Sequence, residues 1–259
     1  MRILFVADVV GVPGRRAVEE RLRPLREELD VDLCIVNGEN AADGVGITAK
    51  LADKLLGSGA DVITLGNHTW RRNDIGAYLA ASDRVVRPAN FSARAPGRGL
   101  VFVRARDGTE AAVINLQGAL FMDTQTHPFE VAERLVDDAR ARTRVIVVDI
   151  HAEATSEKVA LARMLDGKVT AVIGTHTHVQ TNDARVQPGG TAALTDAGMT
   201  GPHDSVIGVV PDLAIRRMRT GLPVRFQTAS GDVRIEGCIV DCDERGRAMR
   251  CEPIRVPVA

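Results

Sequence analysis

Short apolar runs rich in β-branched residues alternate with amphipathic stretches through the first third of the chain. The apolar runs at residues 2–7, 31–36 and 62–65 predict strands buried on both faces. The stretches between them predict helices, because apolar residues such as Leu22 and Leu25 recur at helical spacing among charged ones. Strands that alternate with helices predict a parallel sheet with right-handed crossovers.

The later part of the chain continues this alternation and then departs from it. Residues 144–150, 156–165 and 169–174 predict a strand, a helix and a strand. Asp107-Gly108 lies between two shorter apolar runs and predicts a hairpin turn. Antiparallel strands are expected near the end of the chain, at residues 224–226, 233–241 and 249–256. No linker, repeat or low-complexity segment interrupts the sequence, so one domain is predicted over residues 1–259.

Composition limits the classes of protein to consider. The 259 residues are 45% hydrophobic and 26% charged, which argues against a disordered or fibrous chain. With 33 Lys plus Arg against 34 Asp plus Glu, the net charge supports neither a membrane surface nor an extended nucleic-acid footprint as a partner. An aromatic content of 3% leaves few platforms for stacking bases. Four cysteines without metal or redox spacing, and the lack of a signal-peptide pattern, predict a cytoplasmic protein.

Polar residues with metal-binding side chains follow the predicted parallel strands. They are Asp8, Glu39, Asn40, Asn67, His68, His151, His176 and His178. Each has an ordinary explanation as a cap, a turn residue or a loop histidine. Together they favour one shared site, because ligands of open parallel sheets bind outside the carboxyl ends of the strands. His176 and His178 are alternate residues, so an extended backbone would direct both to one side.

The side-chain types in this set suit a hydrolytic site with two metal ions. Mixed imidazole, carboxylate and carboxamide ligands favour Mn, Fe, Zn or Co over Ca or Mg. Two such ions about 3.5 to 4 Å apart, bridged by a carboxylate and a hydroxide, create a nucleophile and neutralise charge on a phosphoryl oxygen. A histidine near the ions but not bound to them can protonate the leaving alkoxide.

The motifs that carry these residues resemble the calcineurin-like metallophosphoesterase superfamily. The matching blocks are Asp8, Gly38-Glu39-Asn40, Gly66-Asn67-His68, His151 and Gly174-Thr175-His176-Thr177-His178. The resemblance implies an α/β fold, a four-layered αββα sandwich with two mixed sheets and the metals at the strand ends. Three positions depart from the superfamily pattern: Val10 replaces a histidine, Glu39 replaces the bridging Asp, and Thr69 replaces an acid.

The segments Asp8-Val9-Val10-Gly11, Asn37-Gly38-Glu39-Asn40 and Gly198-Met199-Thr200-Gly201-Pro202 are similar to the bacterial YmdB-type branch of this superfamily. That resemblance implies a phosphodiesterase acting on small phosphodiesters, notably 2',3'-cyclic nucleoside monophosphates, by attack of a metal-bridging hydroxide. Carried over by position, metal 1 is held by Asp8, Glu39, Asn40 and His178, and metal 2 by Glu39, Asn67, His151 and His176. His68 is the general acid. Two divalent or trivalent transition-metal ions are implied, with iron and manganese favoured over zinc.

Other interpretations use the same residues. A phosphomonoesterase or a nuclease would need the same site, with Arg71, Arg72 and Arg94 as a local basic patch. Loss of a ligand at Val10 would instead suit a non-catalytic sensor of nucleotide or metal, although the proton donor His68 argues against it. His127 and His203 receive no role. A homo-oligomer is expected if strand 233–240 pairs with another chain.

Overall fold

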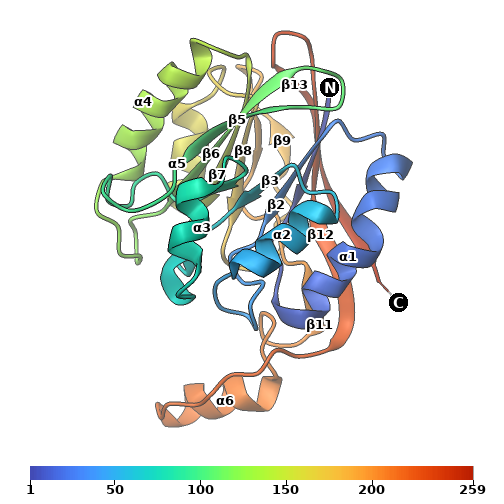
Figure 1. The fold of residues 1–259 in the computed structure, drawn as a ribbon, viewed down its shortest axis with the longest axis vertical. Coiled ribbons are helices and arrows are strands. Elements are labelled where there is room, and N and C mark those ends of the chain that lie inside the picture. The colour runs from blue at the N-terminus through green and yellow to red at the C-terminus, as the bar shows by residue number, and fades with distance from the viewer. Residues whose placement is uncertain (259) are drawn as a thin grey trace.

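Two mixed β-sheets form the centre of the protein in this computed structural model, which describes residues 1–258 (Figure 1). The first sheet has the order β11-β12-β1-β2-β3-β4, with β13 paired to β12. Its strands are β1 (Arg2–Val6), β2 (Leu33–Asn37), β3 (Val62–Thr64), β4 (Val85–Val86), β11 (Gly201–Asp204), β12 (Gly231–Cys242) and β13 (Ala248–Pro257). The second sheet, in the order β5-β6-β7-β8-β10-β9, contains β5 (Leu100–Arg104), β6 (Glu110–Gln117), β7 (Val145–His151), β8 (Ala171–Thr175), β9 (Arg185–Val186) and β10 (Ala192–Leu194).

Helices connect these strands and cover the sheets. They are α1 (Gly11–Glu28), α2 (Ala49–Gly57), the 3-10 turn η1 (Thr69–Arg71), α3 (Ile75–Ala81), α4 (Pro128–Arg140), α5 (Thr155–Met164) and α6 (Pro211–Thr220). The predicted apolar stripe of α1 includes Leu22 and Leu25, and both are buried. Thr48 caps α2 by accepting a hydrogen bond from the backbone N–H of Leu51 at 3.3 Å. Helix α6 projects away from the sheets (Figure 1).

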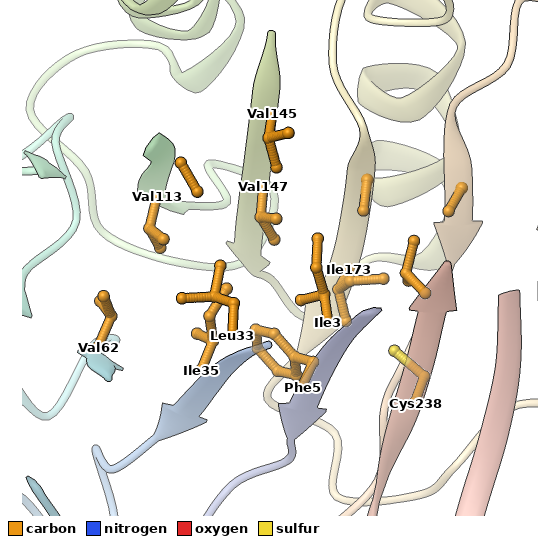
Figure 2. Packing of buried hydrophobic residues seen from close by; sticks show 14 of the residues in the cluster. Ile3, Phe5, Leu33, Ile35, Val62, Val113, Val145, Val147, Ile173 and Cys238 are labelled. Carbon is orange, nitrogen blue, oxygen red and sulfur yellow. The ribbon is translucent and has the colours of Figure 1, made fainter. Parts of the chain in front are cut away.

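Three hydrophobic layers hold the sandwich together. The middle layer lies between the two sheets, where Phe5 and Ile35 of the first sheet pack near Val147 and Ile173 of the second (Figure 2). A second layer joins the outer face of the first sheet to α1, α2 and α3. A third joins the outer face of the second sheet to α4 and α5. Helices therefore cover both sheets, and the four-layered αββα arrangement with two mixed sheets is confirmed.

Parallel pairing directs one end of each sheet toward the same region. Strands β1, β2, β3 and β4 run parallel to one another, and so do β6, β7 and β8. The predicted hairpin at Asp107-Gly108 is also confirmed, because β5 and β6 pair antiparallel across it. The loops after β1, β2 and β3 consequently meet the ends of β7 and β8.

Two expectations about the C-terminal strands are wrong. Residues 224–226 form no strand, because this segment has no neighbouring strand to pair with; its nearest bridge joins Thr228 to Val209. Strand β12 does not offer a free edge for another chain over residues 237–241, because β1 pairs with one edge and β13 with the other. Within residues 1–258, no helix has both the length and the apolar character needed to cross a bilayer.

Candidate metal centre

All eight residues predicted for the site lie together where the two sheets meet. Asp8 follows β1, Glu39 and Asn40 follow β2, Asn67 and His68 follow β3, His151 ends β7, and His176 and His178 follow β8. Asp8, Glu39 and His151 are fully buried. The backbone N–H of His176 donates to Asp8 Oδ2 at 3.2 Å. The site therefore takes its side chains from both sheets.

A first group gathers around the carboxamide of Asn40. Its Nδ2 lies 3.1 Å from Glu39 Oε1, 3.2 Å from His178 Nε2 and 3.5 Å from Asp8 Oδ1. His178 Nε2 also lies 3.6 Å from Asp8 Oδ1. Two carboxylates and an imidazole nitrogen thus converge on the Nδ2 group of Asn40, whose hydrogens carry partial positive charge. The oxygen and nitrogen of a carboxamide can exchange places, so Asn40 can present an oxygen to the same position.

A second group converges on the Nε2 atom of His151. Glu39 Oε1 and Asn67 Oδ1 each lie 3.0 Å from this nitrogen, and His176 Nδ1 lies 3.1 Å from it. The ligand atoms of Glu39, His151 and His176 all lie within 4.8 Å of one another. One ring nitrogen carries at most one hydrogen, so hydrogen bonding alone cannot satisfy three neighbours. Glu39 belongs to both groups and connects them.

Residues next to the site fix which nitrogen of His151 faces its centre. Thr175 donates a hydrogen bond from Oγ1 to Asp149 Oδ1 at 2.7 Å, and His151 Nδ1 lies 2.8 Å from the same hydroxyl. Asn37 Nδ2 donates to the other oxygen of Asp149 at 3.0 Å. The Nδ1–H of His151 therefore points to Thr175, and the lone pair of a neutral ring remains on Nε2. Such outer partners orient metal-binding histidines.

The other two histidines are oriented in the same way. His178 Nδ1 donates to the carbonyl oxygen of Ile207 at 2.9 Å, which leaves Nε2 toward Asp8. His176 Nε2 lies 3.2 Å from Glu153 Oε2, which leaves Nδ1 toward His151. The expected extended backbone is wrong, because φ is 103° at His176 and 63° at His178. Strained backbone of this kind clusters at functional sites, where the surrounding structure maintains it.

A buried ion pair holds the loop that carries these two histidines. Lys158 Nζ lies 2.9 Å from Asp196 Oδ2. The same carboxylate oxygen accepts hydrogen bonds from the backbone N–H and the hydroxyl of Thr177, at 3.0 and 2.7 Å. Thr177 lies between His176 and His178, so Asp196 fixes the turn that places both rings. The sequence pattern did not point to Asp196, Lys158, Asp149 or Thr175.

Glycines permit two close approaches at the site. A Cβ atom at Gly66 would lie 2.2 Å from His151 Cδ2 and 2.3 Å from Glu39 Oε2. A Cβ atom at Gly174 would lie 1.9 Å from the carbonyl oxygen of Thr195. Real side chains cannot occupy these positions without displacing their neighbours. The glycines that precede Asn67 and His176 in the two motifs are therefore required by the packing of the site.

The charges of the site favour two ionised carboxylates beside protonated imidazole. Burial by itself would raise the pKa of Asp8, but hydrogen bonding and charge from His178 hold that pKa below its ordinary value. Burial likewise opposes ionisation of Glu39, and His151 holds its pKa well below the usual range. Burial opposes protonation of His151, but Glu39 raises its pKa to about 9. Burial and the neighbouring His151 lower the pKa of His176 to about 4.

His68 lies at the edge of both groups. Its Nδ1 is 2.7 Å from Asn40 Oδ1 and 3.2 Å from Glu39 Oε1. Its backbone N–H donates to Glu39 Oε2 at 3.0 Å. The side chain is 26% exposed, whereas that of Glu39 is fully buried. His68 therefore combines a fixed position with access to solvent.

The positions that depart from the superfamily pattern have structural partners. Val10 is buried, and a Cβ atom at Gly208 would lie 2.8 Å from its Cγ1, so Val10 fills a tightly packed space. The hydroxyl of Thr69 donates to the carbonyl oxygen of Gly66 at 2.6 Å and closes the turn after β3. His127 caps α4, because its Nδ1 accepts from the backbone N–H of Phe129.

Comparisons with known proteins agree with this geometry. A curated protein of Bacillus subtilis (strain 168) named 2',3'-cyclic-nucleotide 2'-phosphodiesterase is 48% identical over 257 residues, which cover 99% of this chain and 97% of that protein. A crystal structure of a hypothetical protein from Thermus thermophilus has a TM-score of 0.93 at 40% identity and covers 99% of both chains. A crystal structure of a novel phosphatase from Mycoplasma pneumoniae has a TM-score of 0.91 at 33% identity, covering 99% of this chain and 93% of that one. The family model described as YmdB-like protein matches residues 4–254, and the chain belongs to this family.

Proposed function

We propose that this protein is a dinuclear metal-dependent phosphodiesterase that hydrolyses small phosphodiesters, with 2',3'-cyclic nucleoside monophosphates as substrates. The observation that carries the proposal is the pair of ligand groups that share Glu39, with His68 beside both. The curated relative named as a 2',3'-cyclic-nucleotide 2'-phosphodiesterase supports the same reaction.

The side chains fit two transition-metal ions. Asp8, Glu39, Asn40 and His178 would hold one ion, and Glu39, Asn67, His151 and His176 would hold the other. Both sets mix carboxylate, carboxamide and imidazole groups, which suits iron or manganese, with zinc as an alternative. The Nδ1 atoms of His151 and His178 are held by outer partners, so each ring can give up the proton on Nε2 and bind an ion through that atom. The depressed pKa values of Asp8 and Glu39 also favour ligation. When bound, the ions generate a nucleophile from water and neutralise charge on the phosphoryl group.

His68 supplies the proton that the leaving oxygen needs. Its Nδ1 is engaged with Asn40 and Glu39, so Nε2 remains for the substrate. Because His68 is held by its backbone contact with Glu39, it stays next to the ligand groups without belonging to either. A histidine in this position acts as a general acid toward the ribose oxygen that departs. Opening the ring at the 2' oxygen would leave a 3'-monophosphate.

Counting metals and comparing substrates tests this function. We expect two metal ions per chain by elemental analysis and faster hydrolysis of 2',3'-cyclic AMP and bis(p-nitrophenyl) phosphate than of the monoester p-nitrophenyl phosphate. The relative described as a phosphatase makes phosphomonoesterase activity the second candidate; faster monoester cleavage would favour it. Fewer than two ions per chain, without hydrolysis of either class, would favour the non-catalytic sensor.

The metal-free protein is expected to lose stability as the pH rises from about 6.5 to 9. The folded-state pKa of His151 is raised from 6.5 to about 9, so the stabilising charge is fully present below pH 6.5 and disappears as the folded protein loses its proton. Each unit of pKa shift corresponds to about 1.4 kcal/mol. Urea unfolding of chelator-treated protein at several pH values measures this slope.

The matched control for this pH dependence is the metal-loaded protein. Ligation requires neutral imidazole, so the folded, loaded protein has no proton to lose from His151 over the same interval. Its free energy of unfolding should not fall between pH 6.5 and 9. An equal alkaline decline in both forms would contradict the assignment of His151.

We also propose a cytoplasmic location and a homo-oligomeric state. All four cysteines are free thiols in the structure, which suits a reducing compartment. Around α6, Met218 is 77% exposed and Leu222 is 58% exposed. Exposed apolar groups on a projecting helix favour association with a second copy. Light scattering of the full chain measures the oligomeric state.

A further inference from the structure

A cavity of about 510 Å³ opens next to the second ligand group. Asn67 and His176 line its inner end. The turn after β3 and the loop at residues 118–127 supply other parts of its wall. The volume is typical of a small-molecule site. Because two residues of the metal centre form part of the wall, a ligand in this cavity would be continuous with one at the centre.

Aromatic side chains are concentrated at this cavity. The chain has one Trp, one Tyr and six Phe, yet Trp70, Phe91 and Phe121 all line this single cavity. The ring centroids of Trp70 and Phe91 lie 6.2 Å apart at an interplanar angle of 40°. Trp70 is 41% exposed, although tryptophan is usually well buried. Although the chain has few aromatic residues, three of them lie at this cavity and provide stacking platforms.

The loop of residues 118–127 holds Phe121 out in solvent against its conformational preference. Phe121 is 91% exposed, and its φ of 64° lies in the left-handed region that bulky residues avoid. Buried side chains fix the loop on either side of it. Gln117 Nε2 donates to the carbonyl oxygen of Asp123 at 2.6 Å, and Glu157 Oε1 accepts from the backbone N–H of Ala119 at 2.8 Å. Ordered, strained exposure of a large ring is typical of a binding residue.

Arg71 adds a positive charge to the same wall. The neighbouring Arg72 is committed to the fold, because its guanidinium donates to the carbonyl oxygens of Val45 and Ala42. Within residues 1–258, the guanidinium of Arg71 forms no hydrogen bond or ion pair. A guanidinium free to stack or to bind an anion, beside three aromatic rings, suits a nucleotide.

A larger cavity of about 810 Å³ lies between α1 and residues 225–230. None of the eight residues predicted for the metal centre lines it. It is therefore separate from the reacting groups.

We propose that the cavity lined by Trp70, Phe91 and Phe121 binds the nucleobase of the substrate. The placement of the phosphate at the metal centre rests on the proposed function. Stacking on aromatic rings accepts any base, because every base has a π-face. Purines offer more ring area than pyrimidines, so the cavity favours 2',3'-cyclic purine nucleotides. Trp70 and Phe121 are thus specificity residues that contact the base and not the reacting atoms.

Tryptophan fluorescence tests base binding without any turnover. Trp70 is the one tryptophan in the sequence, so its emission reports directly on this cavity. Titration with adenosine 3'-monophosphate is expected to quench the emission, because the base stacks near the indole. Ribose 5-phosphate, which has no base, should leave the emission unchanged. No quenching by adenosine 3'-monophosphate, or equal quenching by both probes, would overturn the proposal.

Kinetics of a Phe121→Asn variant provide the second test. Asparagine tolerates the left-handed backbone at this position, so the variant removes the ring and keeps the loop. We expect kcat/KM for 2',3'-cyclic AMP to fall by about 5- to 150-fold through a higher KM, with kcat unchanged. Hydrolysis of methyl riboside 2',3'-cyclic phosphate, which lacks a base, should not change. Phe226→Ala is the matched control, because Phe226 is also exposed (41%) but lines the larger cavity.

The two tests separate the base site from the reaction. Quenching by adenosine 3'-monophosphate in a protein that cleaves no diester would support the base site and contradict the proposed function. Hydrolysis of 2',3'-cyclic AMP without quenching, and with equal kcat/KM in wild type and Phe121→Asn, would support the function and overturn the base site.

Discussion

Replacing His68 by alanine is expected to lower kcat for 2',3'-cyclic AMP by about 10²- to 10⁴-fold while both metal ions stay bound. The side chain lies beside Asn40 and Glu39 but outside the two ligand groups. Its removal deletes a proton donor and leaves every proposed ligand in place. Elemental analysis of the variant together with steady-state kinetics measures both quantities.

The leaving group provides a sharper version of this experiment. p-Nitrophenolate departs without a proton, so His68→Ala should slow bis(p-nitrophenyl) phosphate much less than 2',3'-cyclic AMP. His127→Ala is the matched control, because His127 caps α4 and lies outside the site. Equal losses for both substrates would assign His68 to positioning, and loss of metal from the variant would make it a ligand.

Replacing Gly66 by alanine is expected to abolish tight metal binding. The added Cβ would lie 2.2 Å from His151 Cδ2 and 2.3 Å from Glu39 Oε2. Both side chains must move away, and Glu39 belongs to both ligand groups. Loss of a supporting contact at a metal site typically costs 10- to 100-fold in affinity, so displacement of two ligands should cost at least about 100-fold. Metal titration and diester hydrolysis measure the effect.

Gly57→Ala is the matched control for this substitution. A Cβ atom at Gly57 would have no heavy atom within 4 Å, and alanine is the better helix former at the end of α2. This variant should bind two ions and fold normally. Two tightly bound ions in Gly66→Ala would contradict the close approach seen at the site. Circular dichroism of both variants shows whether the sheets themselves remain folded.

The strands and the positions of the site residues could be predicted because their signals are local. A run of β-branched residues ending in Gly66-Asn67-His68 or Gly174-Thr175-His176 marks both a buried strand and the loop after it. Parallel pairing then brings such loops to one edge. For this reason, residues as distant as Asp8 and His178 were correctly expected to lie near each other.

The contacts that orient the histidines could not be predicted, because they depend on pairs far apart in the chain. Asp149 and Thr175 lie on neighbouring strands, and Lys158 reaches Asp196 from α5. A buried polar residue on an apolar strand indicates that a partner exists, but not which one. The positive φ of His176 could not be predicted for the same reason, because the packing of the loop imposes it.

Composition was misleading about the aromatic residues. A low total predicts few stacking platforms, but the total contains no information about where the rings gather. Trp70 and Phe91 lie 21 positions apart in sequence, and the fold places their rings at one cavity. Only the arrangement of the loops in space reveals that concentration.

The division of the site between the sheets has a mechanical consequence. The first sheet supplies the residues that follow its strands, which are Asp8, Glu39, Asn40 and Asn67. The second sheet supplies His151 at the end of β7, and His176 and His178 after β8. Ions bound as proposed would connect two layers that are also joined by the apolar contacts of Phe5 and its neighbours and by the hydrogen bond from Asn37 to Asp149. Free energy of metal binding then adds to the cohesion of the sandwich. Loss of the metal ions would then lower the stability of the folded protein as well as stop hydrolysis.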